Sequence, residues 1–464
     1  MESVPKENIS AIIFLPAMNS QLNIEIENLS KITDQIFHSF YEQHKPPALV
    51  YGVTIGGQLL HCKGLGFANL GQATIADRST LFRIASMTKS FAAAAILQLR
   101  DCGKLKLTQS PVDFVPELKA LPQWKSRTIF HLLTMQSGLP TDDPWADRFL
   151  LANDEEYSRI FEEPPIFVAE AGEEYHYSNL GYMILGRIIS QVAEEHACSF
   201  ISRSILMPLG LNNTTWTASK FSTDKIATGY HRIDGKDSPV PAGDVKGDGA
   251  LFAGLLSTIV DISRWMDFLC STHSEEREHV LTSSSRRELQ RAVVLVPPTI
   301  SKTTHKLEEY IGYGLGLRCL SLSDLWSVGH SGGLPGYGSH MRWIPQIGLG
   351  VVALSNLTYC PVWDPCREIL QLLYKNTACS RATIPGLVAS RGEQLISLLR
   401  KWDDEIADNI FASNYFQDVP RPVAMRRFQE VGKGAKGEIN LSYTEGLSGA
   451  IFIEGIKMIM YSLA

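Results

Sequence analysis

A serine followed three positions later by a lysine is the first pair in this chain with the types and spacing for nucleophilic chemistry. The pattern occurs three times, at residues 3–6, 86–89 and 222–225. Only Ser86 opens a long alanine-rich stretch with strong helix propensity, whereas the other two copies lie beside a proline or run into a glycine. Residues three apart share one face of a helix, so the Lys89 amine can approach the Ser86 hydroxyl.

The chemistry of this pair depends on its place at a helix start. Unpaired backbone N–H groups there favour a developing anion. A serine hydroxyl needs a neighbour to remove its proton, and a lysine whose pKa is lowered by burial can contribute. The alternative interpretation makes Ser86 a simple helix cap and Lys89 a solvated surface residue. Two further motifs favour the first interpretation.

The second motif, Tyr-Ser-Asn, precedes a predicted helix over residues 180–193. Tyr177 and Asn179 therefore occupy a loop that can point into a cleft. An ammonium beside a tyrosine stabilises the phenolate and lowers its pKa from ~10, so Lys89 next to Tyr177 would make such a pair. The alternative is a core tyrosine followed by a Ser/Asn helix cap.

The third motif, His-Ser-Gly, ends an apolar stretch that begins near Leu325. Small residues at a strand edge, here including Gly332 and Gly333, let backbone amides approach a substrate closely. His330 is expected to donate a hydrogen bond to substrate or to the Tyr177 oxygen. The alternative is a glycine-rich hairpin with an incidental histidine.

The order of the motifs SMTK, YSN and HSG resembles the active-site elements of the class C β-lactamase, DD-peptidase and family VIII esterase superfamily. The surrounding segments FRIASMTKSFAAAAILQL, TIFHLLTMQSGLP and GLLSTIVDISRWM resemble the same superfamily. The similarity covers residues 32–375 and leaves out the segment after about residue 380.

This resemblance implies a role for each motif residue. It makes Ser86 the nucleophile, Lys89 and Tyr177 the proton-transfer pair, and Asn179 an orienting hydrogen-bonding residue. Backbone N–H groups of Ser86 and Gly333 would form the oxyanion hole.

The third element departs from the pattern of many β-lactamases, which carry Lys-Thr-Gly where this chain has His330, Ser331 and Gly332. His330 and Gly332 are assigned to substrate binding and orientation. A histidine of ordinary pKa ~6.5 is largely neutral at pH 7, whereas a permanent ammonium suits the carboxylate of β-lactams. The departure favours esterases, transesterases or aminopeptidase-like relatives over a dedicated penicillinase.

We therefore expect a serine hydrolase that forms an acyl-enzyme on Ser86 and cleaves an ester or amide of a small-molecule acyl substrate, with esterase-like activity favoured. One alternative is an acyltransferase or transesterase that uses the same site. Another is a non-catalytic protein that assembles or senses ligands. The chemistry requires no metal or organic cofactor. Substrate identity and oligomeric state are left open, and His131, Trp145, Tyr337 and Trp343 are either cleft-lining or ordinary packing residues.

The composition of the chain argues against certain classes of partner and cellular environment for this protein. The 464 residues are 44% hydrophobic and carry a formal net charge of -6, which gives no basic footprint for nucleic acid. No stretch reaches the ~18 apolar residues of a membrane span, and no secretory signal is recognisable at the N-terminus. Eight dispersed cysteines without a CxxC pair argue against a disulfide scaffold or a thiolate zinc site. A cytoplasmic protein is expected.

The elements that position the motifs follow from periodicity. Hairpins are predicted over 48–65 and 339–355. Between them, the spacing of apolar residues predicts helices at 89–99, 180–193 and 258–270. Further helices are predicted at 22–42 and 364–375. These signals indicate an α+β fold of the α/β sandwich type, with an antiparallel sheet from both chain ends and an inserted, mainly helical subdomain. The cleft is expected at their junction.

The chain is expected to divide into three parts. Residues 1–20 are a loose lead-in, 21–379 the β-lactamase-like domain, and 380–464 a small C-terminal appendix of unknown role. Within the appendix, 393–412 is amphipathic, and 451–463 is an apolar ending that suits a strand of a small module or an edge that needs a partner.

Overall fold

The computed structural model describes residues 26–143, 145–241, 243–245, 247–271, 277–297, 310–322, 325–376, 386–411, 415–434, 441–444 and 450–453. The described residues up to Asn376 form one compact unit, and those from Gly386 onward belong to a second. The expected boundaries at residues 20 and 379 lie outside the described residues, so the three-part division stays a prediction.

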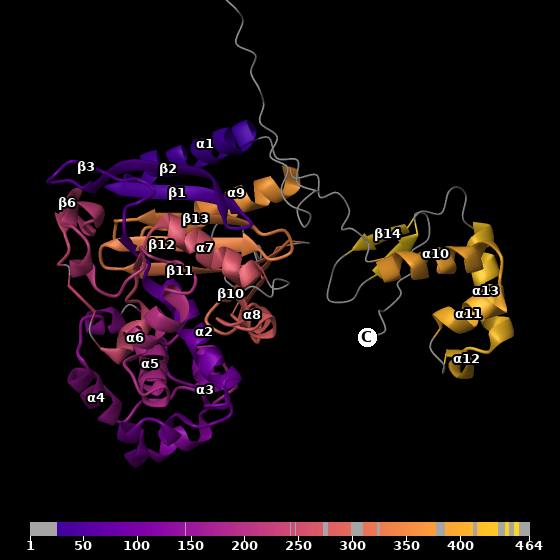
Figure 1. Cartoon of the computed structure of the whole chain (residues 1–464), viewed down its shortest axis with the longest axis horizontal. Helices are drawn as coiled ribbons and strands as arrows, with labels where there is room; N and C mark the ends of the chain where they lie inside the picture. Colours follow the sequence, from indigo (N-terminus) through magenta and orange to yellow (C-terminus); the bar gives the residue numbers. More distant parts are fainter. Residues whose placement is uncertain are drawn as a thin grey trace, which may run out of the picture. The chain divides into compact units, whose positions relative to one another are not determined.

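An antiparallel sheet of nine described strands forms the centre of the first unit (Figure 1). Strands from the start of the chain pair directly with strands from its end, as the sequence predicts. In spatial order the strands are β3 (Thr74–Ile75), β2 (Gln58–Asn69), β1 (Ala48–Ile55), β13 (Leu349–Ser355), β12 (Tyr337–Ile344), β11 (Leu325–Leu334), β10 (Arg318–Leu322), β9 (Tyr310–Tyr313) and β8 (Val294–Leu295).

Successive residues of β1 show how helices cover both faces of the sheet. Tyr51 stacks on Phe37 of α1 (Ile26–His44), with ring centroids 4.1 Å apart. The next residue, Gly52, faces α7 (Ile259–Cys270), where an added Cβ would lie 3.2 Å from Ile259 Cδ1. Because successive strand residues point to opposite faces, α1 and α7 lie on opposite sides of the sheet. Helix α9 (Trp363–Asn376) packs beside α1.

The predicted helical insertion lies below the sheet in Figure 1. Its helices are α3 (Ile129–Leu133), α4 (Asp154–Glu162), α5 (Asn179–Ala193) and α6 (Ala197–Ile201), and α2 (Thr88–Asp101) packs against α5 and α6. Short strands accompany them, namely β4 (Phe82–Arg83), β5 (Tyr230–Ile233), β6 (Lys236–Pro239) and β7 (Leu256–Ser257). The helices predicted at 22–42, 89–99, 180–193, 258–270 and 364–375 are confirmed within a few residues of each end.

A glycine on α5 brings a short 3-10 helix, η9 (Asp248–Phe252), close to α2 and Lys89. A Cβ at Gly186 would lie 1.9 Å from the Asp248 carbonyl oxygen, so only glycine allows this approach. The packing places the far end of η9, at Phe252, against α2. Its carbonyl oxygen then becomes available to Lys89.

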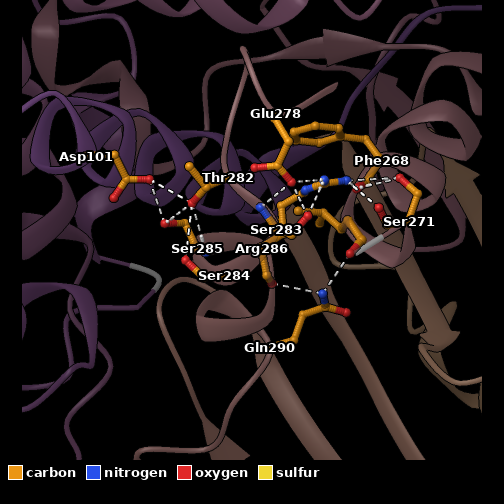
Figure 2. A network of polar contacts seen from close by, with 11 residues as sticks. Asp101, Phe268, Ser271, Glu278, Thr282, Ser283, Ser284, Ser285, Arg286 and Gln290 are labelled. Atoms are coloured by element: carbon orange, nitrogen blue, oxygen red, sulfur yellow. Dashed lines mark hydrogen bonds and ion pairs between the residues drawn. The ribbon is translucent and has the colours of Figure 1, made fainter. Parts of the chain in front are cut away.

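A polar network fixes α8 (Ser283–Leu289) between α2, α7 and the sheet (Figure 2). Asp101, at the end of α2, accepts a hydrogen bond from Ser285 Oγ at 2.6 Å. Gln290, next to α8, donates to the Leu269 carbonyl oxygen of α7 at 2.8 Å and accepts from Trp343 Nε1 of β12 at 2.9 Å. These bonds tie the helices to the strands that carry the site.

The second unit contains α10 (Gly386–Arg400), α11 (Asp404–Ile410), α12 (Tyr415–Asp418), α13 (Arg421–Gly434), β14 (Leu441–Thr444) and β15 (Ala450–Ile453). The predicted amphipathic stretch 393–412 divides between α10 and α11. The second unit has a small core of buried residues, namely Leu395, Leu398, Leu399, Ala407 and Phe428. The start of the apolar ending lies in β15, as a strand prediction requires, and the rest lies outside the described residues. No helix among the described residues is long and apolar enough to cross a membrane.

Candidate active site

The turn that carries Ser86 is held by close backbone packing. Ser86 lies in the 3-10 helix η1 (Ala85–Met87), which leads directly into α2, and Ala85 has a φ of +48°. Ser339 Oγ of β12 donates to the Ile84 carbonyl oxygen at 2.8 Å. A Cβ at Gly332 would lie 2.3 Å from the same oxygen, so glycine is needed for β11 to approach the turn.

Ser86 and Lys89 are in direct contact. Lys89 Nζ donates to Ser86 Oγ at 2.9 Å, and the Lys89 side chain is fully buried. No capping hydrogen bond from a side chain occurs at the start of η1 or α2. The interpretation of Ser86 as a cap and Lys89 as a solvated residue is therefore wrong.

Neutral oxygens complete the surroundings of the Lys89 amine. Nζ donates to Asn179 Oδ1 at 2.6 Å and to the Phe252 carbonyl oxygen at 2.8 Å. Burial lowers the pKa of Lys89 to about 7, against the opposing influence of carboxylates led by Asp143. A substantial fraction of the lysine is thus neutral at physiological pH and able to accept a proton.

Tyr177 adjoins this pair, but its pKa moves opposite to our expectation. Lys89 Nζ lies over the Tyr177 ring, 4.9 Å from its centroid. Burial raises the pKa of Tyr177 well above its usual value, while a hydrogen bond with Ser86 acts in the opposite direction. The expected acidic phenol is wrong, because burial is the largest influence on the pKa of Tyr177 and disfavours the charged phenolate. Tyr177 is a neutral phenol next to Ser86.

Asn179 is positioned by an aspartate that the sequence analysis did not assign to the site. Asp142 accepts from the Asn179 backbone N–H at 2.7 Å, from the Leu180 N–H at 2.9 Å and from Ser178 Oγ at 3.1 Å. The carboxylate thus caps the N-terminus of α5. In the sequence, Asp142 is only an acidic residue in a predicted turn, 37 positions before Asn179. Nothing in that pattern indicates that the two residues are in contact.

His330 contacts neither Tyr177 nor Lys89 through its ring nitrogens. Its Nδ1 donates to the Ser331 carbonyl oxygen at 2.6 Å, which leaves Nε2 as the acceptor for the Tyr313 hydroxyl at 3.2 Å. Burial lowers the pKa of His330 far below its usual value, and the charge of Arg318 adds to the effect. The ring is neutral and almost fully enclosed, and it bonds to Tyr313 rather than to the Tyr177 oxygen, one of the two partners that we expected. The other expected partner, the substrate, stays a prediction.

The sequence analysis also missed three side chains that lie at the site, namely Arg318, Asp147 and Tyr359. Arg318, on β10, holds its guanidinium carbon 5.8 Å from the centroid of the Tyr177 ring. It forms no hydrogen bond or ion pair with any other described residue. Tyr359 packs its ring against Gly333 and donates its hydroxyl to Asp147. These residues lie outside the three motifs, so their places at the site become visible only in the folded structure.

The structure shows where the four ring-bearing candidates for cleft lining, His131, Trp145, Tyr337 and Trp343, lie. Trp343 is buried, and Tyr337 is buried with its hydroxyl bound to the Ala227 carbonyl oxygen at 2.8 Å. His131 caps α3, because its Nδ1 accepts from the Thr128 N–H at 3.2 Å. Trp145 lines a cavity.

A separate cluster, comprising Asp154, His196 and Asp248, is the one group in the described part of the chain with the composition and spacing of metal ligands. Asp248 already has cationic and hydroxyl partners. Arg187 Nη1 lies 3.3 Å from its Oδ2, and Ser190 Oγ donates to Oδ1 at 2.5 Å. The arginine supplies the positive charge that a cation would bring, so the cluster fits a structural ion pair.

Comparisons with known proteins agree with this geometry. Residues 33–370 match the family model described as Beta-lactamase. Protein flp of Staphylococcus aureus is 27% identical over 337 residues, an alignment that covers 71% of this chain and 64% of that protein. Penicillin-binding protein 4* of Bacillus subtilis is 27% identical over 212 residues, 44% of this chain and 46% of that one. The chain thus spans less than two thirds of the length of these curated relatives.

Solved structures show the same fold. The octameric penicillin-binding protein homologue from Pyrococcus abyssi matches with a TM-score of 0.65 and 25% identity over 81% of this chain and 82% of its own. The penicillin-binding protein from Bacillus halodurans matches with a TM-score of 0.59 and 23% identity over 72% of this chain and 98% of its own. The family model matches well over half of the length of this chain. The chain therefore belongs to the β-lactamase family, within the β-lactamase-like serine hydrolase superfamily.

Proposed function

We propose that this protein is a serine hydrolase that forms an acyl-enzyme on Ser86 and cleaves esters or amides of small molecules, with esters favoured. The observation that carries the proposal is the 2.9 Å contact between Ser86 Oγ and a fully buried Lys89 whose pKa is about 7. A neutral amine at this distance can take the hydroxyl proton at the moment of attack.

The proposed reaction has two balanced halves. Ser86 Oγ attacks the carbonyl carbon while its proton passes to Lys89 Nζ, and backbone N–H groups of Ser86 and Gly333 hold the resulting oxyanion. Collapse breaks the bond to the leaving group, which receives the proton from Lys89 through the Tyr177 hydroxyl. Water then attacks the acyl carbon and passes a proton through the Tyr177 hydroxyl to Lys89. The bond between the acyl carbon and Ser86 Oγ breaks, Lys89 returns the proton to Ser86 Oγ, and the acid is released.

Arg318 supports substrates with an anionic group beside the scissile bond. The neutral His330 cannot supply a positive charge at the third motif, whereas the guanidinium lies beside Tyr177 without a partner among the described residues. An ester of 3-hydroxybenzoate should therefore react faster than the matching phenyl ester. The Arg318→Gln variant should remove this preference of about 10- to 100-fold, since bonds to charged groups contribute ~1.5–3 kcal/mol.

Covalent labelling tests the nucleophile directly. A fluorophosphonate probe should label the wild-type protein and the Ser222→Ala variant, but not Ser86→Ala. Ser222 is a matched control because it heads an exposed copy of the same Ser-x-x-Lys pattern. Equal labelling of Ser86→Ala, or no labelling together with no turnover of any ester, would remove the proposal. Adding an alcohol acceptor measures acyl transfer, the alternative use of the same acyl-enzyme, from the yield of the new ester against free acid.

A further inference from the structure

A cavity of about 560 Å³ lies within the helical insertion, next to the start of α5. Leucine, isoleucine, proline, phenylalanine and tryptophan side chains form nearly all of its wall. Trp124 and Phe161 lie in the buried part, while Trp145 and Ile166 are 47% and 77% exposed and mark its rim. The volume falls in the ordinary range of small-molecule pockets, ~300–1,000 Å³.

The charges around this cavity select against an ionic occupant. Only two acidic residues, Asp142 and Glu163, are among the described residues that line it, and no basic residue does. Both carboxylate oxygens of Asp142 are occupied by N–H and hydroxyl donors at the start of α5. Glu163 is exposed to solvent. An occupant therefore gains mainly from burying apolar surface.

The cavity adjoins the catalytic residues through a single loop. Thr141 and Asp142 form part of the cavity wall. Asp142 also binds the Asn179 N–H at 2.7 Å, and the neighbouring Asp143 accepts from Asn179 Nδ2 at 3.3 Å. Asn179 in turn accepts from Lys89 Nζ at 2.6 Å. The cavity wall is thus linked to Lys89, the hydrogen-bond partner of Ser86, through Asp142 and Asn179.

We propose that the cavity holds an aliphatic acyl chain, so the preferred substrates are esters of medium-chain acids rather than acetyl esters. This inference rests on the proposed function, because it assigns the acyl side of the same reaction. Each buried methylene contributes about 0.8 kcal/mol, so kcat/KM should rise by up to about fourfold per added methylene until the cavity is full.

A chain-length series tests the assignment kinetically. The substrates are 3-acyloxybenzoates with acyl groups from acetyl to decanoyl, which share one leaving group. Wild-type kcat/KM should rise along the series, and Ile166→Asp, which places a charge at the rim, should flatten it. The matched control is Ile75→Asp, because Ile75 is 71% exposed and lies on β3 outside the cavity. Neither variant touches the catalytic residues.

A binding measurement separates the cavity from catalysis. Calorimetric titration of the Ser86→Ala variant with 1-octanol should give one site, weakened at least fivefold by adding Ile166→Asp and unchanged by adding Ile75→Asp. In the wild-type protein, octanol should compete with the decanoyl ester and should not accelerate the release of free acetate from the acetyl ester; any octyl acetate formed by acyl transfer is counted separately.

The outcomes distinguish the two proposals. Equal kcat/KM for all chain lengths, or octanol binding that Ile166→Asp leaves unchanged, would overturn the acyl-chain assignment while the hydrolase stands. Octanol that accelerates the release of free acetate from the acetyl ester, counted apart from any octyl acetate formed by acyl transfer, would also overturn it, because the cavity would then hold an effector. No turnover of any ester, acetyl included, would remove the hydrolase and its acyl-chain assignment together, even with octanol bound.

Discussion

Two buried cations in this molecule have opposite surroundings. Lys89 and Arg286 are both fully enclosed. Arg286 has a carboxylate partner, with Nη2 3.2 Å from Glu278, and donates to the Ser271 carbonyl oxygen at 2.7 Å (Figure 2). Among the residues that the structure describes, Lys89 bonds only with neutral oxygens, those of Ser86, Asn179 and Phe252.

The difference separates a structural charge from a reactive one. A guanidinium keeps its proton under all ordinary conditions, so the network around Arg286 gains only by satisfying its donors. A lysine without a bonded carboxylate loses its proton easily when desolvated, and the pKa of Lys89 accordingly falls to about 7. The fold thus places a removable proton beside Ser86 and a permanent charge on α8.

The largest expected effect comes from removing the reactive cation. Lys89→Met should lower kcat/KM for ester hydrolysis by about 10³-fold or more, because Ser86 loses its proton acceptor. The free energy of unfolding should change by less than about 2 kcal/mol, since relief from burying an amine offsets the lost hydrogen bonds. Lys225→Met, in the exposed copy of the pattern, is the control and should match the wild type. Activity within tenfold of the wild type would contradict the assignment of Lys89.

The reverse result is expected for the structural cation. Arg286→Met should lower the free energy of unfolding by about 2–4 kcal/mol, because buried carbonyl groups of Phe268 and Ser271 lose their donor. The kcat of the folded fraction should be unchanged. Chemical denaturation measures the free energy of unfolding. Active-site titration gives the concentration of folded enzyme from which kcat is calculated. The neighbouring exposed Arg287→Met should stay within ~0.5 kcal/mol of the wild type, and an equally large loss there would refute the comparison.

The pH profile sharpens the comparison further. With Lys89 as the base, kcat/KM should fall about tenfold per pH unit below pH 7 and level off above it. Because the lysine pKa is lower in the folded chain than its usual 10.5, the unfolded chain binds the extra proton between these values. Stability from this group should therefore rise from pH 7 to 10.5, by at most about 5 kcal/mol.

The Lys89→Met variant provides the control for the pH dependence of stability. Its free energy of unfolding, measured by denaturation across the same range, should rise less with pH than that of the wild type. Equal slopes for the two proteins, or a kcat/KM profile flat down to pH 5, would contradict a lysine pKa near 7.

Local sequence signals predicted the sheet and the motif helices because each depends on neighbours in the chain. Gly56 and Gly57 form a turn between apolar runs, and the β1–β2 hairpin follows from that pattern alone. The contact between Ser86 and Lys89 is equally local, since it depends on one helical turn.

Features that depend on distant contacts were not predictable in this way. Arg318 reaches Tyr177 only through strand order in the sheet, and Asp142 meets Asn179 across a loop. The direction of the Tyr177 pKa was also missed, because desolvation depends on how completely the fold encloses the ring. His330 was assigned to substrate from its motif, while its bond partner Tyr313 comes from a neighbouring part of the sheet.

The smallest expected effect tests how remote charges set the reactivity of Lys89. Asp142→Asn should cost about 1–2 kcal/mol of stability, because an amide replaces one of the acceptors that cap α5. The carboxylate also raises the pKa of Lys89, so its loss should shift the acid limb of the kcat/KM profile to lower pH. Asp113→Asn, at an exposed position, should leave both quantities unchanged. A shift to higher pH in Asp142→Asn would mean that Asp142 acts on Lys89 chiefly by positioning Asn179, and that its charge is secondary.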